Sequence, residues 1–246
     1  MFGTAGRRAV EERLRSLRAE LAADFCIVNG ENAADGAGIT PKIADKLLAA
    51  GADVVTLGNH VWRREGIGAY LAQSERVIRP ANLSRSAPGR GLTVQDGVAV
   101  LSFLGSLFLN PPVSAFEVVD DLVAEARRQT PVIFVDLHAE ATSEKIGLAR
   151  WLDGRVTAVI GTHTHVQTND ARILPGGTAA LTDAGMTGPH DSVIGVEAEL
   201  AIRRMRTGMP VRFRPAEGGV RIEGAVIDCD EGGRATAIET LRLPYP

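Results

Sequence analysis

Four short apolar runs in this 246-residue chain each lead directly into a polar segment, and this repeated pairing constrains the fold most strongly. Apolar runs of this length, separated by helical patterns, predict buried strands of an α/β fold with a mixed sheet system. The runs and the polar segments that follow them are 25–28 with Gly30-Glu31-Asn32, 54–57 with Gly58-Asn59-His60, 132–135 with Asp136-Leu137-His138, and 156–160 with Gly161-Thr162-His163-Thr164-His165.

Local signals predict the remaining elements. Thr40 is a favourable N-cap, Pro41 suits the first helical position, and Gly51 suits the end of the helix between them. Asp96-Gly97 predicts a hairpin turn between strands at 92–94 and 98–103. Further helices are expected at 7–20, 66–73, 116–128, 143–152 and 197–205, a strand at 178–181, and antiparallel strands within 210–243. Without a linker or repeat, residues 1–246 are expected to form a single domain.

Composition excludes several classes of protein. The apolar fraction is 45%, the charged fraction is 23% and the net charge is −3, so neither a disordered chain nor an extended nucleic-acid surface is indicated. The longest apolar stretch, 99–109, is too short to span a bilayer. Cys26 and Cys229 cannot form a disulfide framework, which favours a cytoplasmic location. Aromatic residues are only 4%, and no platform for stacking a base is evident.

The polar segments predict a metal site. The carboxyl ends of strands in open α/β sheets gather ligands at one edge, so residues far apart in sequence can meet there. His163 and His165 are two apart and would point to the same side of an extended backbone. The carboxylate of Glu31 can bridge two cations. Three histidines, one carboxylate and two amides exceed the needs of one open site and fit a centre with two metals.

Each residue also has a simpler interpretation. Glu31 alone could cap a helix, and Asn32 and Asn59 alone could be turn residues. Such separate interpretations do not explain why every one of these residues lies directly after a predicted buried strand. Asp136 and Glu140 either orient imidazoles or are ordinary charged residues, and both interpretations stay open. His190 is more typical of a satisfied polar residue, and no role is predicted for Asp183.

Several motifs support a family resemblance. Gly58-Asn59-His60, an isolated His138 and Gly161-Thr162-His163-Thr164-His165 resemble the motifs of calcineurin-like metallophosphoesterases. With Asn29-Gly30-Glu31-Asn32-Ala33 and the run 136–145, the chain looks like the bacterial YmdB-type family over nearly its whole length, which implies a single metallophosphoesterase domain. The resemblance implies a 2′,3′-cyclic-nucleotide 2′-phosphodiesterase with two metals, iron or manganese, that forms 3′-nucleotides. It leaves the oligomeric state open, a homo-oligomer included.

The resemblance also assigns roles residue by residue. Glu31 would bridge both metals. Asn32 and His165 would bind the first metal. The second metal would be bound by Asn59, His138 and His163. His60 would be the proton donor rather than a ligand, a role that suits an imidazole because this group exchanges a proton near neutral pH.

One feature departs from the family pattern. Members begin with a strand that ends in Gly-Asp-Val, and its Asp is a ligand of the first metal. This sequence begins Met1-Phe2-Gly3, and Met1 corresponds to the residue after that Asp. The resemblance therefore predicts a weakly held first metal in the chain as given. The alternative function is a catalytically weak or inactive metal-binding regulatory protein with the same pocket.

Overall fold

A computed structural model describes residues 1–246, and its strands form one sheet of six strands and two of three. The six-stranded sheet has the order β4-β5-β6-β7-β9-β8, with bounds Leu92–Gln95, Val98–Leu104, Val132–His138, Ala158–Thr162, Ala179–Leu181 and Arg172–Ile173. The first small sheet contains β1 (Ile27–Asn29), β2 (Val54–Thr56) and β3 (Val77–Ile78), and the second contains β10 (Gly188–Pro189), β11 (Val220–Cys229) and β12 (Ala235–Pro244). The helices are α1 (Gly3–Glu20), α2 (Pro41–Ala50), α3 (Ile67–Gln73), α4 (Ala115–Arg127), α5 (Thr142–Trp151) and α6 (Ala198–Thr207).

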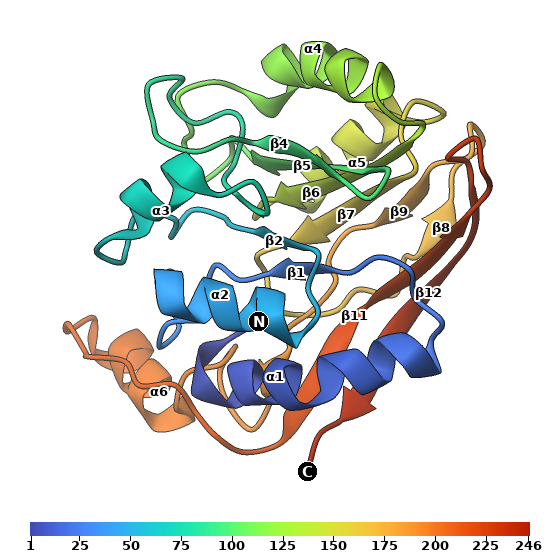
Figure 1. Ribbon diagram of the computed structural model, residues 1–246. Helices are drawn as coiled ribbons and strands as arrows, with labels where there is room; N and C mark the ends of the chain where they lie inside the picture. The colour runs from blue at the N-terminus through green and yellow to red at the C-terminus, as the bar shows by residue number, and fades with distance from the viewer.

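The elements stack in layers, as Figure 1 shows. Helices α4 and α5 cover the outer face of the six-stranded sheet, and α1 and α2 cover the far side of the small sheets. The sheets face each other through apolar side chains, since Val54 and Ile78 of one small sheet pack with Val100 of the large sheet. Ala158 and Ala179 likewise pack with Ala235 of β12. This arrangement confirms the predicted α/β fold with mixed sheets packed face to face and flanked by helices.

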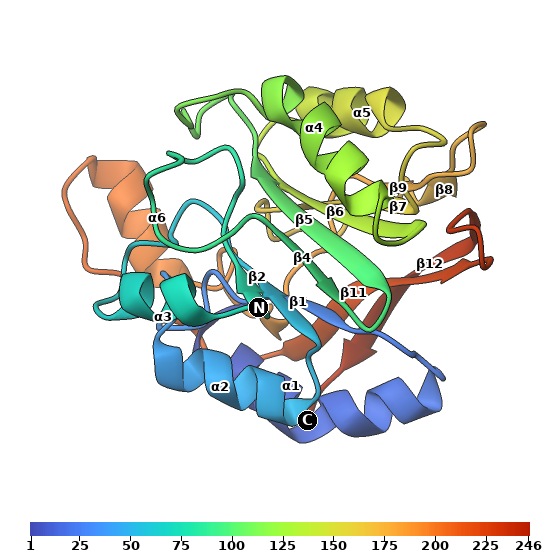
Figure 2. The same ribbon diagram turned by 45° about the horizontal axis from the view of Figure 1, so that its top comes forward.

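The central strands bring the polar segments to one edge. Strands β5, β6 and β7 are parallel, and Leu104, His138 and Thr162 are aligned across them. Strands β1 and β2 are also parallel, with Asn29 opposite Thr56. Figure 2 shows the strands of both sheets from a second direction. Because parallel strands end on the same side, the loops that follow β1, β2, β6 and β7 can meet.

Local sequence signals produced the expected elements in two well-marked places. The Thr40 side chain accepts a hydrogen bond from the Ile43 N–H at the start of α2, and Gly51 ends the helix in the left-handed region. Asp96 and Gly97 both have positive φ in the hairpin that joins β4 to β5. The predicted antiparallel tail is present as β11 and β12.

Other expectations need correction. Strand β6 continues through Asp136 to His138, because neighbouring strands on both sides extend its ladder of hydrogen bonds. Helix α5 begins and ends one residue earlier than the expected 143–152, with Ala141 at its N-cap and no side-chain cap. The short strands β3, β8 and β10 were not predicted, because two residues carry too little periodicity to be recognised. No helix has both the length and the apolar character needed to cross a membrane.

We expect Gly161→Ala to lower the free energy of unfolding by about 1–3 kcal/mol, the usual effect of overpacking. A Cβ at Gly161 would lie 1.9 Å from the carbonyl oxygen of Thr182, which is backbone and cannot move aside. Thermal unfolding measures the effect. Gly224→Ala is the matched control, because a Cβ at Gly224 meets nothing within 4 Å. Equal thermal midpoints for the two variants would contradict the prediction.

Candidate metal centre

The side chains that follow β1, β2, β6 and β7 converge on His138. Its Nε2 lies 3.1 Å from Glu31 Oε2, 3.0 Å from Asn59 Oδ1 and 3.0 Å from His163 Nδ1. Glu31, His138 and His163 offer ligand atoms that all lie within 4.8 Å of one another. The structure therefore brings together four residues that the sequence predicted as neighbours.

A second group of contacts continues from Glu31 through Asn32. The Asn32 Oδ1 lies 2.7 Å from His60 Nδ1, and the Asn32 Nδ2 lies 3.0 Å from His165 Nε2. Glu31 Oε1 is 3.1 Å from the same His60 nitrogen. All seven residues singled out in the sequence thus lie in one continuous cluster, with Glu31 and Asn32 at its centre.

The cluster has the properties of a cation site. Glu31 and His138 are each only 1% exposed, and Glu31 Oε1 is buried without a hydrogen bond of good geometry. A buried carboxylate oxygen left in this state is costly unless a cation or donor reaches it. A Cβ at Gly58 would lie 1.8 Å from Glu31 Oε2, so only glycine leaves room at this position. The donor set of imidazole, carboxylate and amide fits divalent first-row metals.

Burial and neighbouring charges set the protonation of the cluster. Burial acts to raise the pKa of Glu31, but His138 and His60 beside it hold the pKa below its ordinary value. Burial acts to lower the pKa of His138, but the Glu31 carboxylate raises it above the ordinary value. Burial and the adjacent His138 lower the pKa of His163 to about 4, and burial lowers the pKa of His165. Glu31 is therefore ionised while His163 and His165 are neutral, the states in which these groups bind metals.

A hydrogen-bond chain fixes the His138 ring. Its Nδ1 lies 2.9 Å from Thr162 Oγ1, and that hydroxyl donates to Asp136 Oδ1 at 2.7 Å. Asp136 Oδ2 accepts from Thr56 Oγ1 at 2.5 Å and from Asn29 Nδ2 at 3.0 Å. Of the two interpretations left open for Asp136, the geometry supports the one in which it orients an imidazole through Thr162.

The loop after β7 differs from the extended backbone expected from the sequence. His163 has φ 106° and His165 has φ 66°, both in the left-handed region. The two rings consequently reach different partners, His138 for His163 and Asn32 for His165. The expectation that both side chains share one side of a strand is wrong, because β7 ends at Thr162.

A buried ion pair holds this loop in place. Asp183 Oδ2 accepts hydrogen bonds from the Thr164 N–H at 3.0 Å and the Thr164 hydroxyl at 2.9 Å. Lys145 Nζ donates to the same oxygen at 2.8 Å, and the two charged side chains are 3% and 1% exposed. Sequence reasoning assigned no role to either residue. A signal was present for Asp183, because it follows the predicted strand 178–181 just as the ligand candidates follow theirs.

The sequence left the roles of Glu140 and His190 open, and the structure places only Glu140 in contact with the cluster. Glu140 Oε2 lies 3.0 Å from His163 Nε2, so this half-exposed carboxylate is in reach of the imidazole. His190 Nε2 instead lies 2.9 Å from the Met186 carbonyl oxygen and 3.8 Å from Glu223 Oε2. The expected polar role of His190 fits these contacts.

The facing sheets and the cluster at the carboxyl ends of their parallel strands define a metallophosphoesterase of the calcineurin-like fold. The likeness to known proteins extends over nearly the whole sequence. The chain belongs to the YmdB-like protein family, whose model matches residues 1–241.

Three known proteins illustrate the likeness. The 2′,3′-cyclic-nucleotide 2′-phosphodiesterase of Bacillus subtilis (strain 168) is 47% identical over 248 residues, which are 99% of this chain and 94% of the relative. The crystal structure of a hypothetical protein from Thermus thermophilus is 41% identical with a TM-score of 0.93, covering 100% of this chain and 96% of the other. The crystal structure of a novel phosphatase from Mycoplasma pneumoniae is 33% identical with a TM-score of 0.90, covering 99% of this chain and 90% of the other.

We expect Lys145→Met to lower the free energy of unfolding by about 3–5 kcal/mol, because it leaves the Asp183 carboxylate buried without its cation. Adding Asp183→Asn should recover part of this loss by removing the uncompensated charge. Denaturant unfolding of both variants measures the effect.

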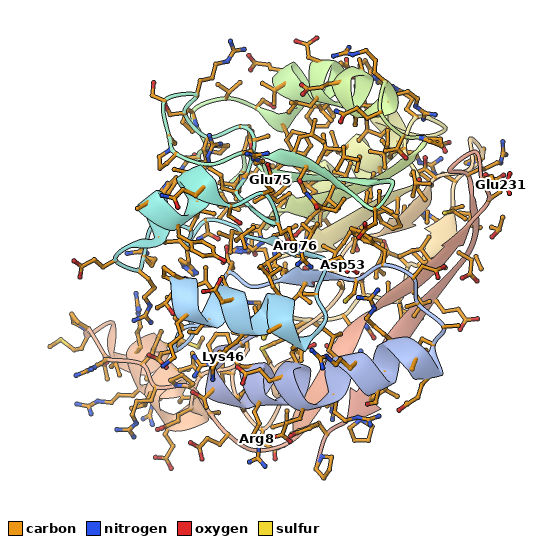
Figure 3. All side chains as sticks on the ribbon, in the orientation of Figure 1. Arg8, Lys46, Asp53, Glu75, Arg76 and Glu231 are labelled. Atoms are coloured by element: carbon orange, nitrogen blue, oxygen red, sulfur yellow. The ribbon has the colours of Figure 1, made fainter.

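The matched control for this pair is Arg8→Met on the outer face of α1, where the arginine side chain is 69% exposed (Figure 3). An exposed pair contributes little, so the control should leave the unfolding midpoint nearly unchanged. If Lys145→Met were as mild as the control, the buried pair would not be holding the loop.

Proposed function

We propose that this chain hydrolyses 2′,3′-cyclic nucleotides to 3′-nucleotides as a metal-dependent phosphodiesterase. The observation that carries the proposal is the buried Glu31 carboxylate, which lies between two sets of imidazole and amide groups and has one oxygen without a hydrogen bond. The named activity of the Bacillus subtilis relative supports the substrate. The relatives do not favour the alternative of an inactive regulatory protein.

Within this proposal the cluster holds two metal ions. Asn59, His138 and His163 would hold one, Asn32 and His165 would hold the other less tightly, and Glu31 would contribute to both. Iron or manganese is the metal that the family resemblance implies, and a donor set of nitrogen and oxygen atoms without a thiolate is compatible with either. Two bound cations would supply Lewis acidity, which lowers the pKa of water and balances negative charge on the phosphoryl oxygens.

The residues of the chain position the substrate and move a proton. The His60 Nδ1 faces Asn32 Oδ1 and Glu31 Oε1, so its Nε2 is free to meet the substrate. The attacking water gives up a proton to solvent, and its oxygen bonds to phosphorus. As this bond forms, the P–O2′ bond breaks and His60 donates its Nε2 proton to the departing oxygen. The product carries its phosphate on the 3′ oxygen.

The remaining parts of the proposal concern the setting of the enzyme. Residues 1–246 act as one domain, in the cytoplasm, with a homo-oligomer left open. Cys26 and Cys229 are both free thiols, which fits a reducing compartment. Burial also raises the pKa of the Cys26 thiol to about 11, so this thiol stays protonated.

One experiment tests the proposed activity directly. Protein purified without chelator is analysed for iron and manganese and then incubated with 2′,3′-cyclic AMP. We expect bound metal and release of 3′-AMP, with activity lost on treatment with chelator and recovered on adding the metal back. Bound metal without turnover would favour the regulatory alternative, and absence of both would contradict the proposal.

We expect His60→Ala to reduce turnover by ~10²–10⁴-fold, the usual contribution of general acid–base catalysis, while metal content stays intact. The loss should shrink for substrates with good leaving groups, which need less protonation. His190→Ala is the matched control, because this histidine contacts Met186 and Glu223 instead of the cluster. Loss of metal in the His60 variant would identify this residue as a ligand.

We expect Glu31→Ala to lower the content of both metals, because Glu31 contacts His60 on one side of the cluster and His138 on the other. We expect His138→Ala to empty mainly one site, because His138 contacts only the group that contains Asn59. Metal stoichiometry after dialysis measures the difference, and circular dichroism checks that each variant is folded. Equal losses in the two variants would argue against the division of ligands between two sites.

A further inference from the structure

A strained two-residue turn lies beside the metal centre. Val193 and Val196 exchange backbone hydrogen bonds of 2.9 and 3.0 Å, with Ile194 and Gly195 as the central pair. Ile194 has φ 46° and Gly195 has φ 103°, so both central residues are in the left-handed region. Turns of this kind prefer Asn, Asp or Gly at the first central position. A β-branched side chain there is a genuine outlier.

The backbone of this turn is fixed against the site. The Ile194 carbonyl oxygen accepts a hydrogen bond from His165 Nδ1 at 2.9 Å. A Cβ on Gly195 would lie 2.6 Å from the ring of Phe2, and that ring lies edge-on to His165 with 5.5 Å between centroids. The carbonyl contact needs only the backbone, which Asn or Gly would supply equally well. The Ile194 side chain is therefore not explained by the orientation of His165.

The Ile194 side chain is also not part of the core. It is 53% exposed, so folding gains little from it, although its conformation is unfavourable. Strained residues of this kind cluster at functional sites, where the surrounding structure holds them in their unfavourable conformation. The question is then which ligand an exposed apolar side chain beside a metal centre would contact.

Two further exposed apolar residues lie within two positions of cluster histidines in the sequence. Val166, adjacent to His165, is 60% exposed, and Trp62, two residues after His60, is 44% exposed. Asn32 touches both His60 and His165, so the chain segments that carry Trp62 and Val166 meet at one part of the cluster. In Figure 1 α6, which begins just after the turn, and α3, which follows Trp62, lie on the same side of the molecule. We call Ile194, Val166 and Trp62 the apolar rim.

We propose that the apolar rim is the subsite for the nucleobase of the substrate, with Ile194 as a specificity-determining residue. This inference rests on the proposed function. The cluster of Glu31, asparagines and histidines suits the charged phosphate, but it offers no apolar surface to a base. A base has two apolar faces that gain from contact with aliphatic or aromatic side chains. The sequence suggested no stacking platform, whereas the structure exposes Trp62, which follows His60 by two residues.

The test uses Ile194→Asn, which keeps the backbone carbonyl and gives the turn its preferred residue before Gly195. We compare kcat/KM for 2′,3′-cyclic AMP with that for methyl riboside 2′,3′-cyclic phosphate, which has no base. The preference for the nucleotide should fall about 10-fold, through KM, because one apolar contact is lost. The thermal midpoint should rise by about 2–4 °C as the strain is relieved.

Ile173→Asn is the matched control, because Ile173 is 40% exposed on β8 and its φ is not positive. This variant should retain the preference for the nucleotide. An unchanged preference in Ile194→Asn would overturn the proposal, as would an equal loss on both substrates, which would mean that the side chain positions His165. A lower thermal midpoint would overturn it too, because the side chain would then be kept for folding.

The experiment also separates this inference from the proposed function. If the wild-type protein hydrolyses neither substrate, the proposed function fails, and calorimetric titration with 3′-AMP and ribose 3-phosphate decides the subsite. Tighter binding of 3′-AMP that Ile194→Asn removes supports the apolar rim. Equal binding of the two ligands overturns it.

Discussion

The buried carboxylate of Glu31 is the constraint on which the site depends. It lies 3.1 Å from His138 on one side and 3.1 Å from His60 on the other, and it is only 1% exposed. An ionised carboxylate at such depth is unfavourable without opposite charge around it. Four loops that come from two sheets supply the surrounding groups. The packing of those sheets through Val54, Ile78 and Val100 therefore stabilises the core and also brings the site residues together.

The loop that carries His163 and His165 illustrates how strain is held at a functional site. Both histidines have positive φ, which is unfavourable for residues with a side chain. Between them Thr164 is fixed by two hydrogen bonds to Asp183, and Lys145 neutralises that carboxylate. Asp136 acts in a similar way on the His138 ring through Thr162. The ligand candidates are thus oriented by buried polar groups on β6, β7 and α5 and after β9, which are rigid parts of the fold.

Charge and apolar character divide the surroundings of the centre. The polar cluster suits an anionic phosphodiester, while Ile194, Val166 and Trp62 are exposed and belong to none of the apolar core clusters. Ile194 connects the two, because its backbone orients His165 and its side chain is exposed. A division of this kind lets one side of the site recognise the reacting group and another side recognise the rest of the substrate.

Much of the fold and of the site followed from the sequence alone. The strands and helices were recognisable from local periodicity, the caps of α2 from Thr40 and Gly51, and the ligand candidates from their common place after apolar runs. All of these signals lie within a few residues of one another. The tertiary structure alone decided the positive φ at His163 and His165, the pairing of Lys145 with Asp183, and the strained turn at Ile194. These features depend on contacts between residues far apart in the chain, such as Asn32 with His165, and long-range contacts of this kind override local preference.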